Sequence, residues 1–313
     1  EDYRLTLWAK AAEGEGGIKV ELIDQLTDSE PQAFVTQELK ITSGEWKKYE
    51  LIMRSPKNDT EASLRILLNG KAPVCLEHVS LFPVKTFKNR KNGMRADLAQ
   101  ALADMHPGVF RFPGGCIVEG ADLQTRYQWK NTIGPVENRP VNENRWQYAM
   151  KSRISPDYYQ SYGLGFFEYF QLSEDIGAEP LPVLNVGMAC QFQNKDDSAN
   201  VPMSELQPYI QDCLDLIELA NDATTTWGRK RAEMGHPAPF NLKYIAVGNE
   251  QWEEPYFKRL PPFVKAIREK YPDIKIIGTC GPAPEGEMFE HGWKAMREIG
   301  VDLVDEHYYK SEE

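Results

Sequence analysis

The sequence predicts a two-domain protein, with an all-β sandwich over residues 1–86 followed by an α/β domain with a parallel sheet over residues 87–313. Three observations support this fold class. The first 85 residues alternate polar and apolar side chains without helical periodicity. After "FKNRKNG", residues 87–93, apolar strands alternate with amphipathic helices. Polar residues then collect where the strands of the second half end.

The sandwich is predicted from short alternating segments that recur about every dozen residues. Gly, Pro, Asn or Ser residues separate them, as expected for turns between antiparallel strands. The expected strands cover residues 3–10, 17–25, 45–54, 62–70 and 74–84.

The second domain is predicted from a repeated order of helix and strand. Its strands run nearly continuously apolar, which is typical of a parallel sheet covered on both faces. The expected helices cover residues 95–105, 165–178, 204–221, 261–271 and 289–300. The expected strands cover residues 108–112, 180–187, 244–250, 274–281 and 303–309.

Polar or reactive side chains follow each of these strands. Parallel strands of α/β barrels and doubly wound sheets place their functional sites at their carboxyl ends, so we expect a site there. A closed barrel needs about eight strands, and only five are readable here. The side chains are Arg111 with Cys116, Asn185, Asn249 with Glu250, Cys280, and His307 with Tyr309.

Composition narrows the classes of function. The chain has 36 Lys and Arg against 47 Asp and Glu, a formal net charge of −11, which argues against nucleic-acid binding and against docking on anionic membranes. No apolar run is long enough for a transmembrane helix, and no signal-peptide pattern is visible from residue 1. The five cysteines are scattered without a C-x-x-C pair, so buried free thiols are expected.

Glu250 is the strongest candidate for catalysis. It closes an apolar strand, where partial desolvation would raise the pKa of its carboxyl and let it protonate a leaving oxygen. Asn249 could donate to a sugar hydroxyl, and Trp252 could offer a face to a sugar ring. Glycoside hydrolysis uses two such carboxyls, about 5–5.5 Å apart in retaining enzymes. The alternative is a strand-end Glu in an ordinary salt bridge.

Longer motifs resemble one family. "RFPGGCIVEG" (111–120), "YQWKNTIGPVENRP" (127–140), "GLGFFEYFQLSEDIGAEPLPVLNVGM" (163–188), "TWGRKRAEMGHPAPFNLKYIAVGNEQW" (226–252) and "DEHYY" (305–309) resemble, in this order, α-L-arabinofuranosidases of glycoside hydrolase family 51. The resemblance implies an incomplete (β/α)8 TIM barrel that contains strands two to six. Strand one would precede residue 1, and strands seven and eight would follow residue 313. The sandwich resembles a carbohydrate-binding module inserted after the first barrel strand.

The resemblance also implies roles for individual residues. Glu250 would be the general acid/base, Asn249 would bind the arabinose hydroxyls, Cys116 would line the sugar subsite, and Tyr309 would lie beside the nucleophile. The nucleophile itself would be a Glu at the end of strand seven, outside this chain.

Further residues have supporting roles in this comparison. Arg111 would face the nucleophilic carboxylate, and Trp129 and Asn185 would form the aglycone wall and the pocket floor. His307 is interpreted as a residue that orients a carboxylate. Trp252 remains a candidate to support the sugar.

The sequence therefore predicts a retaining α-L-arabinofuranosidase that removes terminal arabinofuranosyl residues from arabinan, arabinoxylan or related oligosaccharides. By itself the chain is expected to be inactive, because the nucleophile lies outside it. No cofactor and no catalytic metal are expected, since the histidines show no ligand spacing. Arabinose-containing glycans are the expected partners, with a tendency to form homo-oligomers and a secreted or periplasmic location.

Two alternatives remain. A non-catalytic carbohydrate-binding fragment would explain the absent nucleophile. An endo-xylanase or cellulase of the same clan would explain "GNE" (248–250) but not "RFPGGC" (111–116).

Overall fold

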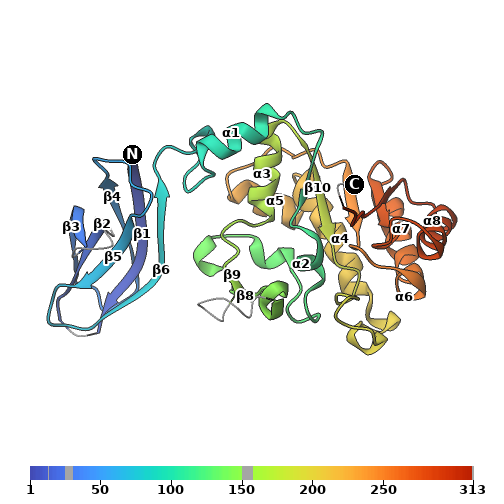
Figure 1. The fold of residues 1–313 in the computed structure, drawn as a ribbon, viewed down its shortest axis with the longest axis horizontal. Coiled ribbons are helices and arrows are strands. Elements are labelled where there is room, and N and C mark those ends of the chain that lie inside the picture. The colour runs from blue at the N-terminus through green and yellow to red at the C-terminus, as the bar shows by residue number, and fades with distance from the viewer. Residues whose placement is uncertain (13, 25–30, 150–157, 312–313) are drawn as a thin grey trace. The chain divides into compact units, whose positions relative to one another are not determined.

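The computed structural model describes residues 1–311, with gaps at residue 13, residues 25–30 and residues 150–157. The chain divides into two compact units, Glu1–Met105 and His106–Glu313 (Figure 1). The expected boundary at residue 86 lies 19 residues earlier than this division (105 − 86). The segment between the two positions includes the buried Phe87, and Thr86 forms an isolated bridge with Arg95.

The first unit is built from two three-stranded antiparallel sheets, with strand orders β4-β1-β6 and β3-β2-β5. The five expected strands are present, and β3 is an additional strand that the sequence analysis missed. Alternation along β1 places Leu5, Leu7 and Ala9 in a core with Ile18 and Val20 of β2. The strands are β1 Asp2–Ala11, β2 Gly16–Asp24, β3 Gln32–Ile41, β4 Lys47–Arg54, β5 Ser63–Leu68 and β6 Val74–Pro83.

The second unit contains a curled, parallel five-stranded sheet with the order β7-β10-β11-β12-β13. Each strand lies beside its successor among the parallel strands, as in part of a (β/α)8 barrel, so the fold class expected from the sequence is confirmed. The strands are β7 Val109–Phe112, β10 Glu179–Leu184, β11 Tyr244–Val247, β12 Lys275–Thr279 and β13 Leu303–Asp305, and a separate small hairpin pairs β8 Asn142–Glu143 with β9 Tyr159–Gln160.

Both faces of this sheet are apolar. Ile245 and Val247 of β11 point into the main core, which the helices α3 (Phe166–Ile176), α4 (Gln207–Asn221), α7 (Leu260–Lys270) and α8 (Glu287–Ile299) complete. Ala246, between them, packs with Val183 and Ile277 in a smaller cluster on the opposite face. Burial on both faces explains why these strands read as continuous apolar runs.

The five long helices expected from the sequence are all present. The sequence analysis missed three shorter ones, α2, α5 and α6, which lie within or next to the long motifs. The α-helices are α1 Ala96–Asp104, α2 Gly115–Glu119, α3 Phe166–Ile176, α4 Gln207–Asn221, α5 Thr226–Glu233, α6 Glu253–Phe257, α7 Leu260–Lys270 and α8 Glu287–Ile299. Short 3-10 helices are η1 Phe87–Asn89, η2 Trp129–Thr132, η3 Val136–Asn138, η4 Arg145–Ala149, η5 Asp197–Ala199 and η6 Met203–Glu205.

Within the described part of the chain, no helix combines the length and the apolar character that a membrane span requires.

Candidate active site

Glu250 lies just beyond the carboxyl end of β11, and only 3% of it is exposed. Gly248 directs the chain out of the strand with φ +99°, and Glu250 itself adopts φ +51°. A Cβ atom at Gly248 would lie 2.6 Å from Gln251 Oε1 and 2.9 Å from the Tyr256 ring, so the turn requires glycine. The strained turn presents the Glu250 carboxylate at the end of the sheet.

Three side chains from other elements converge on this carboxylate. His307 Nδ1 lies 2.8 Å from Glu250 Oε1, and the Tyr309 hydroxyl donates to the same oxygen. The Cys116 thiol donates to Oε2 at 3.6 Å. The structure thus brings together Cys116, Glu250, His307 and Tyr309, which the sequence analysis selected from three different segments.

The expectation of a raised pKa for Glu250 is wrong in this chain. Burial does raise the pKa, but the hydrogen bonds from His307 and Tyr309 outweigh it, so the pKa lies below its ordinary value. The sequence argument considered desolvation alone and could not include donors that arrive from another strand. In this structure Glu250 is therefore a carboxylate held by hydrogen-bond donors.

His307 bridges two carboxylates. Its Nε2 lies 3.1 Å from Asp305 Oδ1, and its Nδ1 contacts Glu250. The hydrogen bonds to Asp305 and then to Glu250 raise the pKa of His307 to about 9, against the opposing effect of burial. A protonated imidazole donates from both nitrogens, so His307 holds the carboxylates of Glu250 and Asp305 together. Asp305 was missed, although it lies in the quoted motif "DEHYY".

Asn249 is fully buried, and both ends of its amide are engaged. Arg111 Nη2 donates to Asn249 Oδ1 at 2.8 Å and to Asp305 Oδ2 at 3.1 Å. Asn249 Nδ2 donates to Glu119 Oε2 at 3.1 Å. These contacts occupy one of the two hydrogen-bonding positions at each end of the amide.

Behind Asn249 lies a buried acidic group that the sequence analysis did not select. Glu119 accepts from Gln251 Nε2 at 2.8 Å, and burial raises its pKa well above the ordinary value. Cys190 lies close to Glu119 and Cys116, and the Arg145 guanidinium is 3.3 Å from its Sγ.

The two thiols of this group differ in acidity. The neighbouring Cys116 thiol, supported by Arg145, lowers the pKa of Cys190 to about 5 despite burial. The neighbouring Cys190, and then burial, raise the pKa of Cys116. Glu119 falls inside the motif "RFPGGCIVEG", but sequence offered no reason to connect it with Cys190, 71 positions later (190 − 119).

Trp252 packs edge-on against the exposed Phe192, with ring centroids 5.2 Å apart. Gln191 fixes the Trp252 backbone, since its Oε1 accepts from Trp252 N at 2.9 Å and its Nε2 donates to Trp252 O at 3.2 Å. Trp252 and Phe192 therefore form an aromatic surface, and Trp252 follows Glu250 by two positions in the sequence.

Asn185 and Trp129 make contacts of a different kind. The Asn185 amide binds backbone groups only, including Val118 O at 3.0 Å and Gly187 N at 2.7 Å. Trp129 is buried, donates to Asp212 O at 3.1 Å and packs against Trp227. Neither contacts Glu250 in the described structure, and both stabilise the protein interior there.

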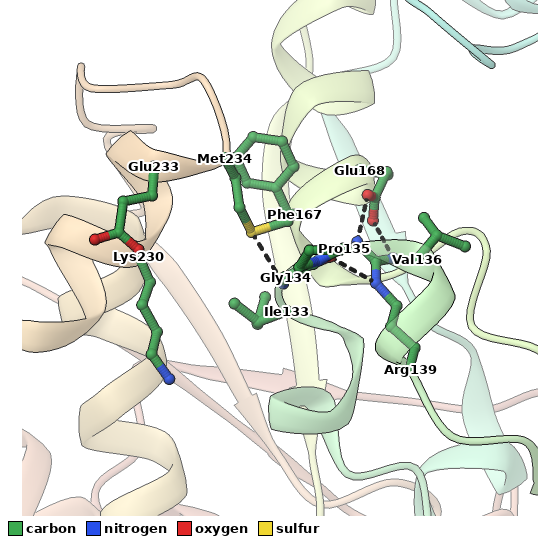
Figure 2. Close-up of a pocket in the computed structure, with 10 residues that line it drawn as sticks. All are labelled: Ile133, Gly134, Pro135, Val136, Arg139, Phe167, Glu168, Lys230, Glu233 and Met234. Atoms are coloured by element: carbon green, nitrogen blue, oxygen red, sulfur yellow. Dashed lines mark hydrogen bonds and ion pairs between the residues drawn. The ribbon is translucent and has the colours of Figure 1, made fainter. Parts of the chain in front are cut away.

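A cavity of about 550 Å³ lies between the segment 133–139 and the end of α5 (Figure 2). Arg139 crosses its wall and pairs with Glu168 at 2.8 Å while donating to Gly134 O at 2.9 Å. None of the residues that line it contacts the Glu250 carboxylate, so it is separate from the candidate active site.

The family model for the α-L-arabinofuranosidase 1 domain matches residues 101–313. An extracellular exo-α-L-arabinofuranosidase of Streptomyces chartreusis is 41% identical over 99% of this chain, and α-L-arabinofuranosidase 1 of Arabidopsis thaliana is 38% identical over 83% of it. The matches cover 36% and 37% of those proteins, so the chain spans about a third of the length of these curated relatives.

Solved structures are similar as well. The arabinose-bound α-L-arabinofuranosidase MgGH51 has a TM-score of 0.75 and 30% identity, with 89% of this chain and 43% of that chain covered. An α-L-arabinofuranosidase of Thermotoga maritima has a TM-score of 0.52 and 22% identity, with 70% of this chain and 40% of that chain covered. The second similarity supports the fold alone.

Proposed function

Because this chain belongs to the α-L-arabinofuranosidases of glycoside hydrolase family 51, we propose that the complete protein removes terminal arabinofuranosyl residues from arabinose-containing glycans with retention of configuration. One observation carries the proposal. Glu250 is a buried carboxyl at the end of a barrel strand, and donors from two other strand ends converge on it. An extracellular relative supports a secreted location.

Glu250 acts in this proposal as general acid and then as general base. It protonates the departing glycosidic oxygen and later removes a proton from the water that releases arabinose. His307 and Tyr309 both engage Oε1, whereas Oε2 has the weaker thiol donor of Cys116, so Oε2 is the oxygen that carries the transferred proton. The Cys116 thiol, beside Oε2, borders the sugar.

The nucleophile is proposed to come from a part of the complete protein outside this chain. Glu119 is a second carboxyl near Asn249, but it is only 2% exposed and both its oxygens accept from amides. Such a group is poorly placed to attack an anomeric carbon. That the chain spans about a third of its relatives supports a nucleophile located elsewhere.

A nucleophilic carboxylate near Glu250 would also explain how Glu250 keeps the proton that a general acid donates. A second carboxylate about 5 Å away would raise the pKa of Glu250, as in other carboxyl pairs. The displacement of water by bound sugar would raise it further. The lowered pKa in this chain is therefore compatible with an acid role in the complete active site.

The proposal is tested by hydrolysis of aryl and alkyl α-L-arabinofuranosides by the complete protein. We expect Glu250→Ala to lower kcat/KM by about 10²–10⁴-fold for the poor alkyl leaving group and less for a nitrophenyl one. Azide should rescue the nitrophenyl substrate and give an arabinosyl azide. Glu254→Ala, an exposed position on α6, is the control.

Two results would overturn the proposal. One is a Glu250→Ala protein with the wild-type rate on the alkyl substrate. The other is calorimetric binding of arabino-oligosaccharides without turnover by the complete protein, which would indicate a binding module.

A further inference from the structure

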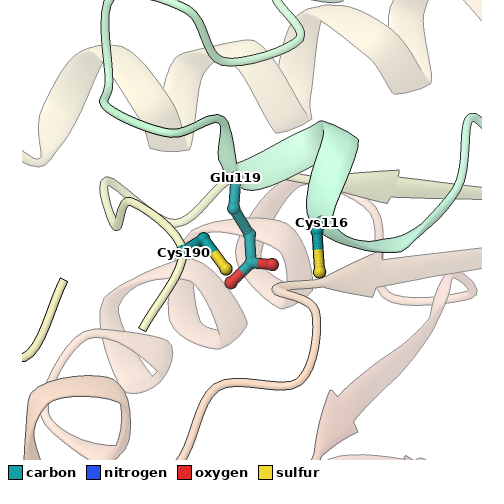
Figure 3. A group of neighbouring side chains, drawn as sticks. All are labelled: Cys116, Glu119 and Cys190. Carbon is teal, nitrogen blue, oxygen red and sulfur yellow. The ribbon is translucent and has the colours of Figure 1, made fainter. Parts of the chain in front are cut away.

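Cys116, Glu119 and Cys190 form a compact group at the carboxyl ends of β7 and β10. Their Sγ atoms and a carboxyl oxygen lie within 4.8 Å of one another. Figure 3 shows the Glu119 carboxylate between the two sulfur atoms, with Cys116 and Glu119 on α2 and Cys190 on a facing loop. Glu119 and Cys190 are buried and Cys116 is partly exposed, so the group is approached from the Cys116 side.

The two segments that carry these side chains are held together by backbone hydrogen bonds. Cys190 N donates to Gly120 O at 3.2 Å. Asn185 Nδ2 donates to Val118 O at 3.0 Å and to Met188 O at 2.9 Å, and so links the end of α2 with the loop that leads to Cys190. The three side chains are therefore preorganised with respect to one another.

A second layer of donors surrounds the group. Gln251 Nε2 and Asn249 Nδ2 donate to the two oxygens of Glu119 at 2.8 and 3.1 Å. Arg145 Nη2 lies 3.3 Å from Cys190 Sγ. Donors of this kind orient the ligand side chains, and such outer partners are typical of metal sites.

We propose that Cys116, Glu119 and Cys190 bind a thiophilic divalent cation of the zinc class. Two sulfur ligands and one carboxylate select zinc-like ions over magnesium or calcium. In a tetrahedral site with Zn–S bonds of about 2.3 Å, the two sulfur atoms are about 3.8 Å apart. The Sγ atoms of Cys116 and Cys190 would therefore have to approach each other by about 1 Å or less to bind the ion. Three protein ligands leave a fourth position open to water.

Binding such a cation would compete with hydrolysis. The Cys116 thiol donates to Glu250 Oε2 in this structure, and a metal-bound thiolate has no proton to donate. This consequence rests on the proposed function, whereas the binding itself does not. Zinc should therefore inhibit the complete enzyme reversibly, with activity restored by a chelator.

Cobalt(II) titration of the reduced protein tests the binding directly. We expect a thiolate charge-transfer absorption that saturates at one cobalt per chain and disappears on addition of zinc. Cys190→Ser and Glu119→Gln should each weaken cobalt binding at least about tenfold. Cys75→Ser, which removes an exposed thiol of the sandwich, should leave it unchanged.

A second measurement uses the wild-type protein, in case the variants fold poorly. Zinc should slow alkylation of Cys116 by iodoacetamide, measured by peptide mass spectrometry, but not that of Cys75. Equal alkylation of Cys116 with and without zinc, at a pH where Cys116 is alkylated in the zinc-free protein, would overturn the proposal. So would a cobalt band that persists in Cys190→Ser. Zinc binding without inhibition would contradict only the link to hydrolysis.

Discussion

At the scale of single residues, His307 gives the clearest pH dependence of folding stability. Its folded pKa of about 9 lies above the ordinary value of 6.5. The ion pairs with Asp305 and Glu250 therefore stabilise the fold fully below about pH 6.5, and this contribution is lost as the pH rises through about 9. The side chain is 17% exposed, so solvent screening reduces the effect to about 1–2 kcal/mol.

We accordingly expect His307→Asn to lower the free energy of unfolding more at about pH 6 than at about pH 10. Urea unfolding of both proteins at several pH values measures the difference. His291→Asn, at an exposed His–Glu253 pair, is the matched control. A His307→Asn deficit that is constant with pH would contradict the assignment.

The sequence analysis selected Glu250, His307, Cys116 and Tyr309 from their motifs, and the structure places these side chains in contact. The sequence analysis missed Glu119, Cys190 and Asp305, because their importance depends on pairings between segments far apart in the chain. Asn185 was selected for its position after a strand, but its amide binds only backbone groups. A strand-end position predicts proximity to a site and does not predict where the side chain points.

At the scale of elements, hydrophobic periodicity was sufficient to predict each helix or strand that packs against the core along its whole length. The five parallel strands and five long helices were predicted for this reason. The strand β3 was missed because much of Gln32–Ile41 is exposed and its apolar residues do not alternate regularly with polar ones. The helix α2 was missed because it spans only Gly115–Glu119 and follows a Pro-Gly-Gly turn that ends the apolar strand.

Gly292 shows how packing can reverse an element's intrinsic preference. Replacing a glycine inside an exposed helix with alanine is normally stabilising by up to about 1 kcal/mol. A Cβ atom at Gly292 of α8 would lie 2.6 Å from Cys280 O and 2.9 Å from Cys280 Cα at the end of β12. Because this contact is with backbone, the strain of about 1–3 kcal/mol should exceed the gain.

We therefore expect Gly292→Ala to lower the free energy of unfolding by about 1–2 kcal/mol. Lys294→Ala, on the exposed side of the same helix, should change it by less than about 0.5 kcal/mol. Chemical denaturation measures both. Stabilisation by Gly292→Ala would mean that α8 does not approach β12 as closely as described.

At the scale of the whole molecule, a change of sequence rhythm correctly predicted a β-sandwich followed by a parallel α/β sheet. The position of the division was harder to predict. The helix Ala96–Asp104 has the periodicity of a barrel helix, but its contacts group it with the first unit, which ends at Met105. Periodicity identifies a helix and its apolar face, and it does not identify the surface against which that face packs.

This division leads to a prediction for the isolated first unit. The sandwich has its own core, and all strands of its two sheets lie within residues 1–105. The segment after residue 86 adds the buried side chains of Phe87 and Ala99. We expect residues 1–105 expressed alone to fold cooperatively, with β-rich circular dichroism and a single urea transition. A fragment that ends at residue 86 should unfold at lower urea, because it loses the apolar burial of that segment. Equal midpoints for the two fragments would place the boundary at residue 86, and an unfolded 1–105 fragment would mean that the sandwich requires the second unit to fold.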